Sequence, residues 1–195
     1  MDKKLAFQLL DVVSSILLKY DIKSFLIGGT LLGVIRDNDF IEHDNDVDLA
    51  ITYDLFSNPK KLLVFIKDLD DNNLRCGSLW DFHQLSILDK NIKKLHLDLV
   101  YCKKENDYYK FTYNSGYHKY PEVYFNTLKQ IKFKNKSFYV PNKSEELLRL
   151  QFGENWETPI ENKKTNDIID TRKKPIKTFN FPLMIPDFGN DDNDL

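Results

Sequence analysis

The chain has 195 residues, the size of one ordinary domain, and its 42% apolar and 30% charged residues are typical of a globular protein. Its 28 basic and 30 acidic residues leave a formal charge of -2, so there is no basic excess for binding a nucleic-acid backbone. The sequence also lacks the apolar run of a membrane span and the pattern of a signal peptide, so we expect neither. Cys76 and Cys102 have no metal-type spacing, which favours a reducing, cytoplasmic location.

The first part of the chain is expected to alternate between helix and strand. Apolar residues recur at helical spacing over residues 5–20, which predicts an amphipathic helix. Residues 24–27 predict a short buried strand that stops at a Gly-Gly pair, and Thr30 is expected to cap a short helix that runs to Arg36. Residues 47–53 predict a second strand, and residues 58–69 predict a second helix with a proline in its first turn.

The second part of the chain is dominated by predicted strands. We expect strands over residues 79–88 and 95–101, an edge strand over 108–113, and a hairpin over 131–140. Residues 144–152 predict a last helix, which ends before a glycine. This pattern indicates an α+β fold with a small mixed or antiparallel sheet flanked by helices.

The composition divides the chain into a body over residues 1–160 and a C-terminal arm over residues 161–195. The arm begins with a polar stretch, residues 161–177, that is rich in Lys and Asn and has little periodicity. Apolar residues return between Phe179 and Phe188, so we expect the arm to pack on the body with only its last residues frayed.

The segment from Phe25 to Ile51 carries the most informative polar pattern. Asp46 and Asp48 flank Val47 at the start of a predicted strand, and the period of two directs both carboxylates to one face. Two neighbouring carboxylates stay ionised only with a cation, and oxygen ligands select Mg²⁺ or Mn²⁺ over zinc. For an isolated Asp-Val-Asp, a solvated turn before a strand is the better explanation.

Three further features favour a metal site for phosphoryl chemistry. Gly28 and Gly29 follow a buried strand and let backbone N–H groups approach a phosphate, although a plain strand-to-helix turn explains them equally well. Arg36 offers a planar fork for two phosphate oxygens, with a surface ion pair as the alternative. Asp98 is a single charge within an apolar strand, which makes it a candidate third metal ligand or base.

The Gly-Gly pair, the spaced Asp-x-Asp and the distant strand aspartate together resemble the nucleotidyltransferase superfamily. The segment Gly29-Thr30-Leu31-Leu32-Gly33, with Arg36, Phe40-Ile41 and residues 44–48, is similar to the signature of the LicD/fukutin family. That family transfers a phospho-alcohol from a CDP-activated donor to a glycan. A second segment, Phe152-Gly153 with Trp156 and Pro159, resembles the family's closing element, so the likeness covers about residues 20–160.

The sequence departs from the family pattern at a few positions. Glu42, His43 and Asn45 stand where the family often has Pro-Trp and a third acidic residue, and Phe152 replaces a tyrosine. These differences bear on the identity of donor and acceptor, because the three aspartates of the metal pattern remain.

The resemblance implies a nucleotidyltransferase-like catalytic domain over residues 1–160, with Mg²⁺ or Mn²⁺ as cofactor. It implies transfer of a phospho-alcohol, such as phosphocholine, ribitol phosphate or glycerol phosphate, from a CDP-activated alcohol to a hydroxyl of a glycan or glycolipid. Asp46, Asp48 and Asp98 would bind the metal and carry catalysis. The donor would contact Gly28, Gly29, Thr30, Arg36, His43 and Asp44.

Other functions compete with this interpretation. A histidine before the aspartates also occurs in antibiotic nucleotidyltransferases, so the alternative is an enzyme that places a nucleoside monophosphate on a small hydroxyl compound. A binding module that has lost turnover is disfavoured by the three aspartates. No pair among the four histidines and two cysteines shows zinc-ligand spacing. The aromatic residues between 108 and 125 either stack a sugar or base or pack in the core.

Overall fold

The computed structural model describes residues 1–79, 83–92, 95–113 and 116–159, and the expected C-terminal arm lies outside these residues. The helices in this part are α1 (Lys3–Lys19), α2 (Gly28–Asp37), α3 (Pro59–Asp71) and α4 (Ser144–Phe152), with one 3₁₀ turn at Glu122–Tyr124. None of these described helices is long and apolar enough to cross a membrane.

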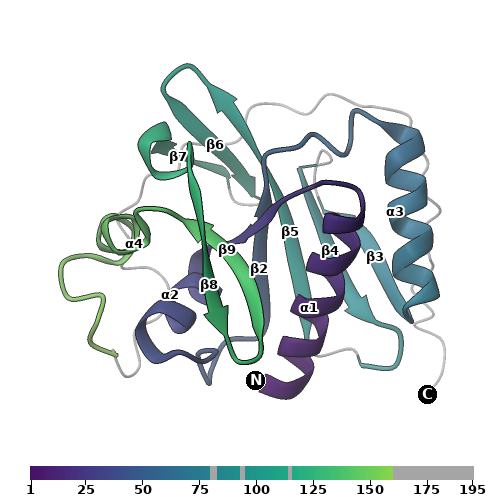
Figure 1. Ribbon diagram of the computed structural model, residues 1–195, viewed down its shortest axis with the longest axis horizontal. Helices are drawn as coiled ribbons and strands as arrows, with labels where there is room; N and C mark the ends of the chain where they lie inside the picture. The colour runs from purple at the N-terminus through teal and green to yellow at the C-terminus, as the bar shows by residue number, and fades with distance from the viewer. Residues whose placement is uncertain (80–82, 93–94, 114–115, 160–195) are drawn as a thin grey trace.

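The strands of the described residues form one mixed sheet (Figure 1). They are β1 (Ser24–Leu26), β2 (Asp46–Ile51), β3 (Leu74–Leu79), β4 (Gln84–Asp89), β5 (His96–Glu105), β6 (Tyr108–Tyr113), β7 (Gly116–Pro121), β8 (Leu128–Phe133) and β9 (Lys136–Pro141). The order is β3-β4-β5-β2-β1-β9-β8, and the β6–β7 hairpin continues from the far part of β5. The pairs β2–β5 and β1–β9 are parallel. The α+β fold with a mixed sheet is therefore confirmed, although the sheet is larger than the one expected.

Helices α1 and α3 pack side by side against one face of the sheet (Figure 1). Asp2 caps α1 and Asn58 caps α3, each by accepting hydrogen bonds from backbone N–H groups of the first helical turn. Lys19 at the end of α1 lies 2.7 Å from the carboxylate of Asp68 on α3, which ties the two helices together. The helix α1 buries Ala6, Leu9, Leu10, Val13, Ile16 and Leu17.

Helix α2 begins earlier than the sequence predicts. It starts at Gly28, after Ile27, and Thr30 lies inside its first turn. The expectation that Thr30 caps this helix is therefore wrong. The Thr30 hydroxyl instead accepts a hydrogen bond from the backbone N–H of Asp48 at 2.8 Å. The hydroxyl thus fixes the start of α2 against β2, the strand that carries the paired aspartates.

The predicted strand over residues 79–88 is also wrong in its bounds. Leu79 ends β3, and β4 begins only at Gln84. The strands β3 and β7 were not predicted. Among the β3 residues 74–77, whose burial the structure describes, Leu74 and Cys76 are buried, and this alternation is too short to stand out in the sequence.

The aromatic residues around β6 and β7 form part of the core. Tyr109, Phe111, Tyr120 and Phe125 are all buried. The ring centroid of Phe125 lies 5.1 Å from that of Phe111 and 5.8 Å from that of Phe25 on β1. Packing therefore explains these four rings, as the second of the two interpretations predicts.

Candidate functional site

Polar side chains of β2 and β5 lie side by side on one face of the sheet. Because the two strands are parallel, Asp46 is in register with His96, and Asp48 is in register with Asp98. Val47, between the two aspartates, is fully buried. The alternation that the sequence predicts for β2 thus holds, and β5 places a second polar pair next to the first.

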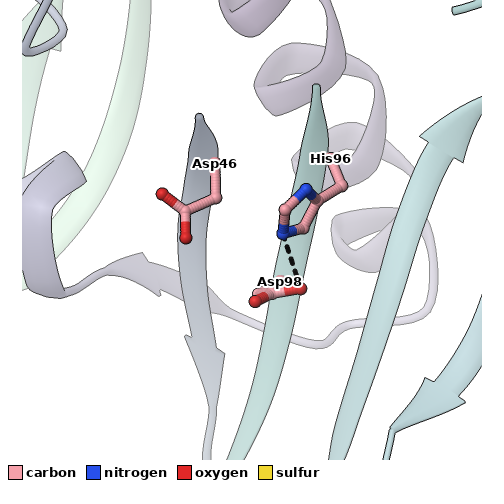
Figure 2. Close-up of side chains that lie close together, drawn as sticks. All are labelled: Asp46, His96 and Asp98. Atoms are coloured by element: carbon pink, nitrogen blue, oxygen red, sulfur yellow. Dashed lines mark ion pairs between the residues drawn. The ribbon is translucent and has the colours of Figure 1, made fainter. Parts of the chain in front are cut away.

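Three of these side chains converge. One ligand atom each of Asp46, His96 and Asp98 lies within 4.8 Å of the other two. Figure 2 shows Asp46 on β2 beside His96 and Asp98 on β5, with their side chains on the same side of the strands. Two carboxylates and one imidazole form a donor set that fits a divalent cation. Within the described residues, this is the one such group of three.

The carboxylate of Asp98 is oriented by strand β4. Ser86 lies directly opposite Asp98 in the β4–β5 pair, and its hydroxyl donates to Asp98 Oδ1 at 2.9 Å. Burial raises the pKa of Asp98 and the charge of Asp46 adds to this, while the hydrogen bond from Ser86 and the charge of His96 lower it. The buried Gln84 also acts to lower this pKa through a side-chain hydrogen bond. The neighbourhood of Asp98 therefore contains excess negative charge that a cation would neutralise.

On the prediction that Asp98 binds a metal, we expect the substitution Ser86→Ala to lower turnover by about tenfold, since a residue that hydrogen-bonds to a metal ligand typically contributes this much. The loss arises because Asp98 Oδ1 no longer has the hydroxyl that holds it in place. Steady-state kinetics measures the effect. Ser57→Ala is the matched control, because the Ser57 hydroxyl donates to a loop carbonyl away from this face. Equal rates for both variants would show that Ser86 does not orient Asp98.

Two further carboxylates lie against the N-terminus of α2. A Cβ added at Gly28 would stand 2.7 Å from Asp48 Oδ2, and one added at Gly29 would stand 2.6 Å from Asp44 Oδ2. Gly28 also has φ +56, a left-handed conformation that favours glycine. The glycine pair therefore makes room for two carboxylates at the positive end of the helix dipole.

Both of these carboxyl groups have raised pKa values. Burial raises the pKa of Asp48 well above its ordinary value, the charges of Asp46, Asp98 and Asp44 add to it, and the backbone N–H of Gly29 opposes it. Burial and the charge of Asp46 also raise the pKa of Asp44. The charge of Asp46 thus acts on the carboxyl groups of Asp44, Asp48 and Asp98.

Arg36 and His43 lie at the edge of this region. The Arg36 guanidinium donates from Nε and Nη2 to the two carboxylate oxygens of Asp37, at 2.9 and 2.7 Å. Arg36 therefore forms an ion pair, which is the alternative to a phosphate contact that the sequence leaves open. The charges of His43 and Arg36 both act to lower the pKa of Asp44, so both groups lie within electrostatic range of that carboxylate.

The structure brings the sequence-predicted residues together in two sets. Asp46 and Asp98 share one group with His96, whereas Asp48 lies outside that group and is in contact with the start of α2. The metal role of Asp48 and the donor contacts stay predictions. Sequence reasoning missed His96 as a neighbour of Asp98, although the spacing of two within a strand was a usable signal.

Comparison with known proteins identifies the family. The family model described as LicD/FKTN/FKRP, nucleotidyltransferase domain, matches residues 21–143, which is more than half of the chain. This range contains both sets of carboxylates and ends before the closing element expected over residues 152–159. No curated protein matches the sequence.

Several solved structures are similar to this chain in outline. The lincomycin-bound lincosamide antibiotic adenylyltransferase LnuA aligns with TM-score 0.48 and 15% identity, over 76% of this chain and 84% of that chain. The solution structure of the antibiotic-resistance factor ANT(2'')-Ia aligns with TM-score 0.49 and 12% identity, over 72% of this chain and 66% of that chain. Similarity at this level does not indicate the substrate of this chain.

Proposed function

Because the chain belongs to the LicD/FKTN/FKRP nucleotidyltransferase domain family, we propose that it transfers a phospho-alcohol from a CDP-activated donor to a hydroxyl group of a glycan or glycolipid. Its membership makes it a transferase of phosphorus-containing groups. The observation that carries the finer proposal is the approach of Asp46 and Asp98, on neighbouring parallel strands, within reach of one cation. Such a pair is suited to phosphoryl transfer, in which charge on phosphate oxygens must be neutralised.

In this proposal Asp46 and Asp98 hold Mg²⁺ or Mn²⁺, and Asp48 adds its charge from the start of α2. The bound cation would neutralise the donor's bridging phosphates. Asp98 would also take the proton of the attacking hydroxyl, because its carboxylate would lie beside the cation that the donor phosphates approach.

The start of α2 is proposed as the place where the donor phosphates bind. Backbone N–H groups of Gly28, Gly29 and Thr30 stand at the positive end of this helix, where anions are favoured. Asp44 and Asp48 occupy the neighbourhood of these glycines, and a cation held at the site would offset the repulsion between these carboxylates and the donor phosphates. Arg36 and His43 would neutralise charge on the leaving nucleotide from the edge of the site.

The reaction forms one bond and breaks one. The acceptor oxygen forms a bond to the phosphorus that carries the alcohol, and the bond from that phosphorus to the bridging oxygen breaks. The bridging oxygen and its electron pair leave with CMP, and the hydroxyl proton passes to Asp98. The acceptor thereby gains a phosphodiester-linked alcohol.

The test is to incubate the protein with Mg²⁺ or Mn²⁺ and a panel of CDP-alcohols and nucleoside triphosphates, each with glycan and small hydroxyl acceptors. We expect CMP to form from a CDP-alcohol only when a glycan or glycolipid acceptor is present. Pyrophosphate release from a nucleoside triphosphate, without CMP from any CDP-alcohol, would contradict the proposal and support the nucleotidyltransferase alternative.

Arg36→Lys should raise the KM for the donor by about tenfold. A lysine provides a point charge but no planar fork for two phosphate oxygens, so the contact with the donor is weakened. Steady-state kinetics with varied donor concentration measures this change. Arg149→Lys is the control, since Arg149 pairs with Glu154 on the helix α4 side. Unchanged constants for Arg36→Lys would mean that Arg36 serves only its ion pair with Asp37.

A further inference from the structure

We infer that His96 is the third protein ligand of the cation held by Asp46 and Asp98, and that its imidazole makes the site prefer Mn²⁺ to Mg²⁺. This deepens the proposed function and rests on it for the presence of a cation in the site. Neither the carboxylate pattern of the sequence nor the family match assigns a role to His96.

The position of His96 is the first argument. It lies in register with Asp46 across the β2–β5 pair and two residues before Asp98 on the same strand, so its ring projects on the same face as both carboxylates. Its Nε2 atom lies 3.8 Å from Asp98 Oδ1. This separation is too long for a hydrogen bond. The two groups are close enough for an ion pair, and the same separation also suits two ligands of one ion, since each would lie about 2.1 Å from that ion.

The position of Asp48 is the second argument. It is in register with Asp98 across the β2–β5 pair, and the sequence predicts it as a metal ligand together with Asp46 and Asp98. Its carboxylate, however, lies against Gly28 and interacts with the backbone N–H of Gly29 at the start of α2. Its ligand atoms fall outside the group formed by the other three side chains. The imidazole thus takes the place that the third carboxylate was expected to fill.

The chemistry of an imidazole ligand gives the metal preference. Mg²⁺ is a hard cation that takes oxygen ligands and keeps several waters, so replacing a carboxylate by an imidazole weakens its binding. Mn²⁺ shares the preference of Mg²⁺ for carboxylate ligands, but as a first-row transition-metal ion it accepts an imidazole nitrogen more readily than Mg²⁺ does. With two carboxylates and one imidazole, the chain would favour Mn²⁺, and His96 would be the residue that determines this selectivity.

Binding of the metal alone tests the inference. Free Mn²⁺ is followed by its electron paramagnetic resonance signal, and Mg²⁺ is measured by competition. We expect His96→Ala to weaken Mn²⁺ binding by at least about tenfold and Mg²⁺ binding by much less. The His96 side chain is 33% exposed, so this truncation should leave the fold intact. His118→Ala is the matched control, because His118 lies on β7, which contributes no residue to the group.

A spectroscopic measurement on the unaltered protein makes the test independent of any variant. Electron spin echo modulation from ¹⁴N should be seen for bound Mn²⁺, should change when the protein contains ¹⁵N-histidine, and should be absent in His96→Ala. Added imidazole should restore it. Absence of nitrogen modulation in the unaltered protein, or an equal loss of Mn²⁺ and Mg²⁺ affinity in His96→Ala, would overturn the inference. Neither readout needs donor or acceptor, so a failure of the CMP assay is distinguishable from a failure here.

Discussion

Asp46→Asn is expected to lower kcat/KM by at least about a hundredfold, because it removes a proposed metal ligand, and even residues that only hydrogen-bond to a metal ligand contribute up to this amount. The amide keeps the size of the side chain at a partly buried position next to fully buried Val47, so the fold should survive. Kinetics in excess Mg²⁺ or Mn²⁺, with circular dichroism on the same samples, checks both statements. A rate near that of the unaltered enzyme would contradict the assignment of Asp46 as a ligand.

Asp48→Asn should also lose most turnover, but with an added effect on stability. The pKa of Asp48 is raised in the folded protein, so its ionised form is disfavoured there. When folding raises the pKa of a carboxyl group, its favourable contribution to the free energy of unfolding is complete below the pKa of the unfolded state. This contribution is lost as the pH rises through the pKa of the folded state. At neutral pH without divalent metal, the variant should therefore be more stable than the unaltered protein. Urea unfolding in EDTA at neutral and acidic pH should show this difference shrinking in acid.

Gly28→Ala is expected to destabilise the protein by about 1–3 kcal/mol, the usual range for a side chain held in the left-handed region. Gly28 has φ +56, and a Cβ there would also stand 2.7 Å from Asp48 Oδ2. The substitution therefore strains the backbone and displaces a carboxylate of the site, so turnover should fall beyond the loss of stability. Urea unfolding and kinetics below the unfolding transition separate the two effects.

Gly77→Ala provides the control for this prediction. A Cβ at Gly77 would meet nothing within 4 Å, and Gly77 has no positive φ. Its replacement should leave stability and turnover unchanged or slightly improved, since alanine loses less conformational entropy on folding. If both glycine variants had equal stability, the requirement for glycine at the start of α2 would be wrong.

Local patterns in the sequence predict much of the fold. The alternation around Val47 places two aspartates on one face, and this depends only on the period of a strand. The apolar spacing of α1 and α3 likewise predicts helices, which the structure confirms with small changes in bounds. The strand alternation and the helical spacing depend only on residues close together in the chain, so a single sequence is enough to predict them.

The parts that were missed depend on long-range pairing. The contact of His96 with the site needs the parallel register of β2 and β5, and the hydrogen bond from Ser86 needs the register of β4 and β5. The sequence predicts a start of α2 at Thr30 because glycines disfavour helices in general. In the structure the helix includes Gly28 and Gly29, whose missing side chains leave space for the carboxylates of Asp44 and Asp48. Tertiary contacts overrode the local preference at that point.

The most direct test of the proposed function is the mass of the acceptor after reaction with a CDP-alcohol. The carboxylates proposed to bind the metal could position any nucleotide pyrophosphate linkage, so they would not decide which phosphorus is attacked. The account predicts that the acceptor gains the mass of the phospho-alcohol, without a nucleoside, and that CMP is released in equal amount. A gain equal to a nucleoside monophosphate would contradict it.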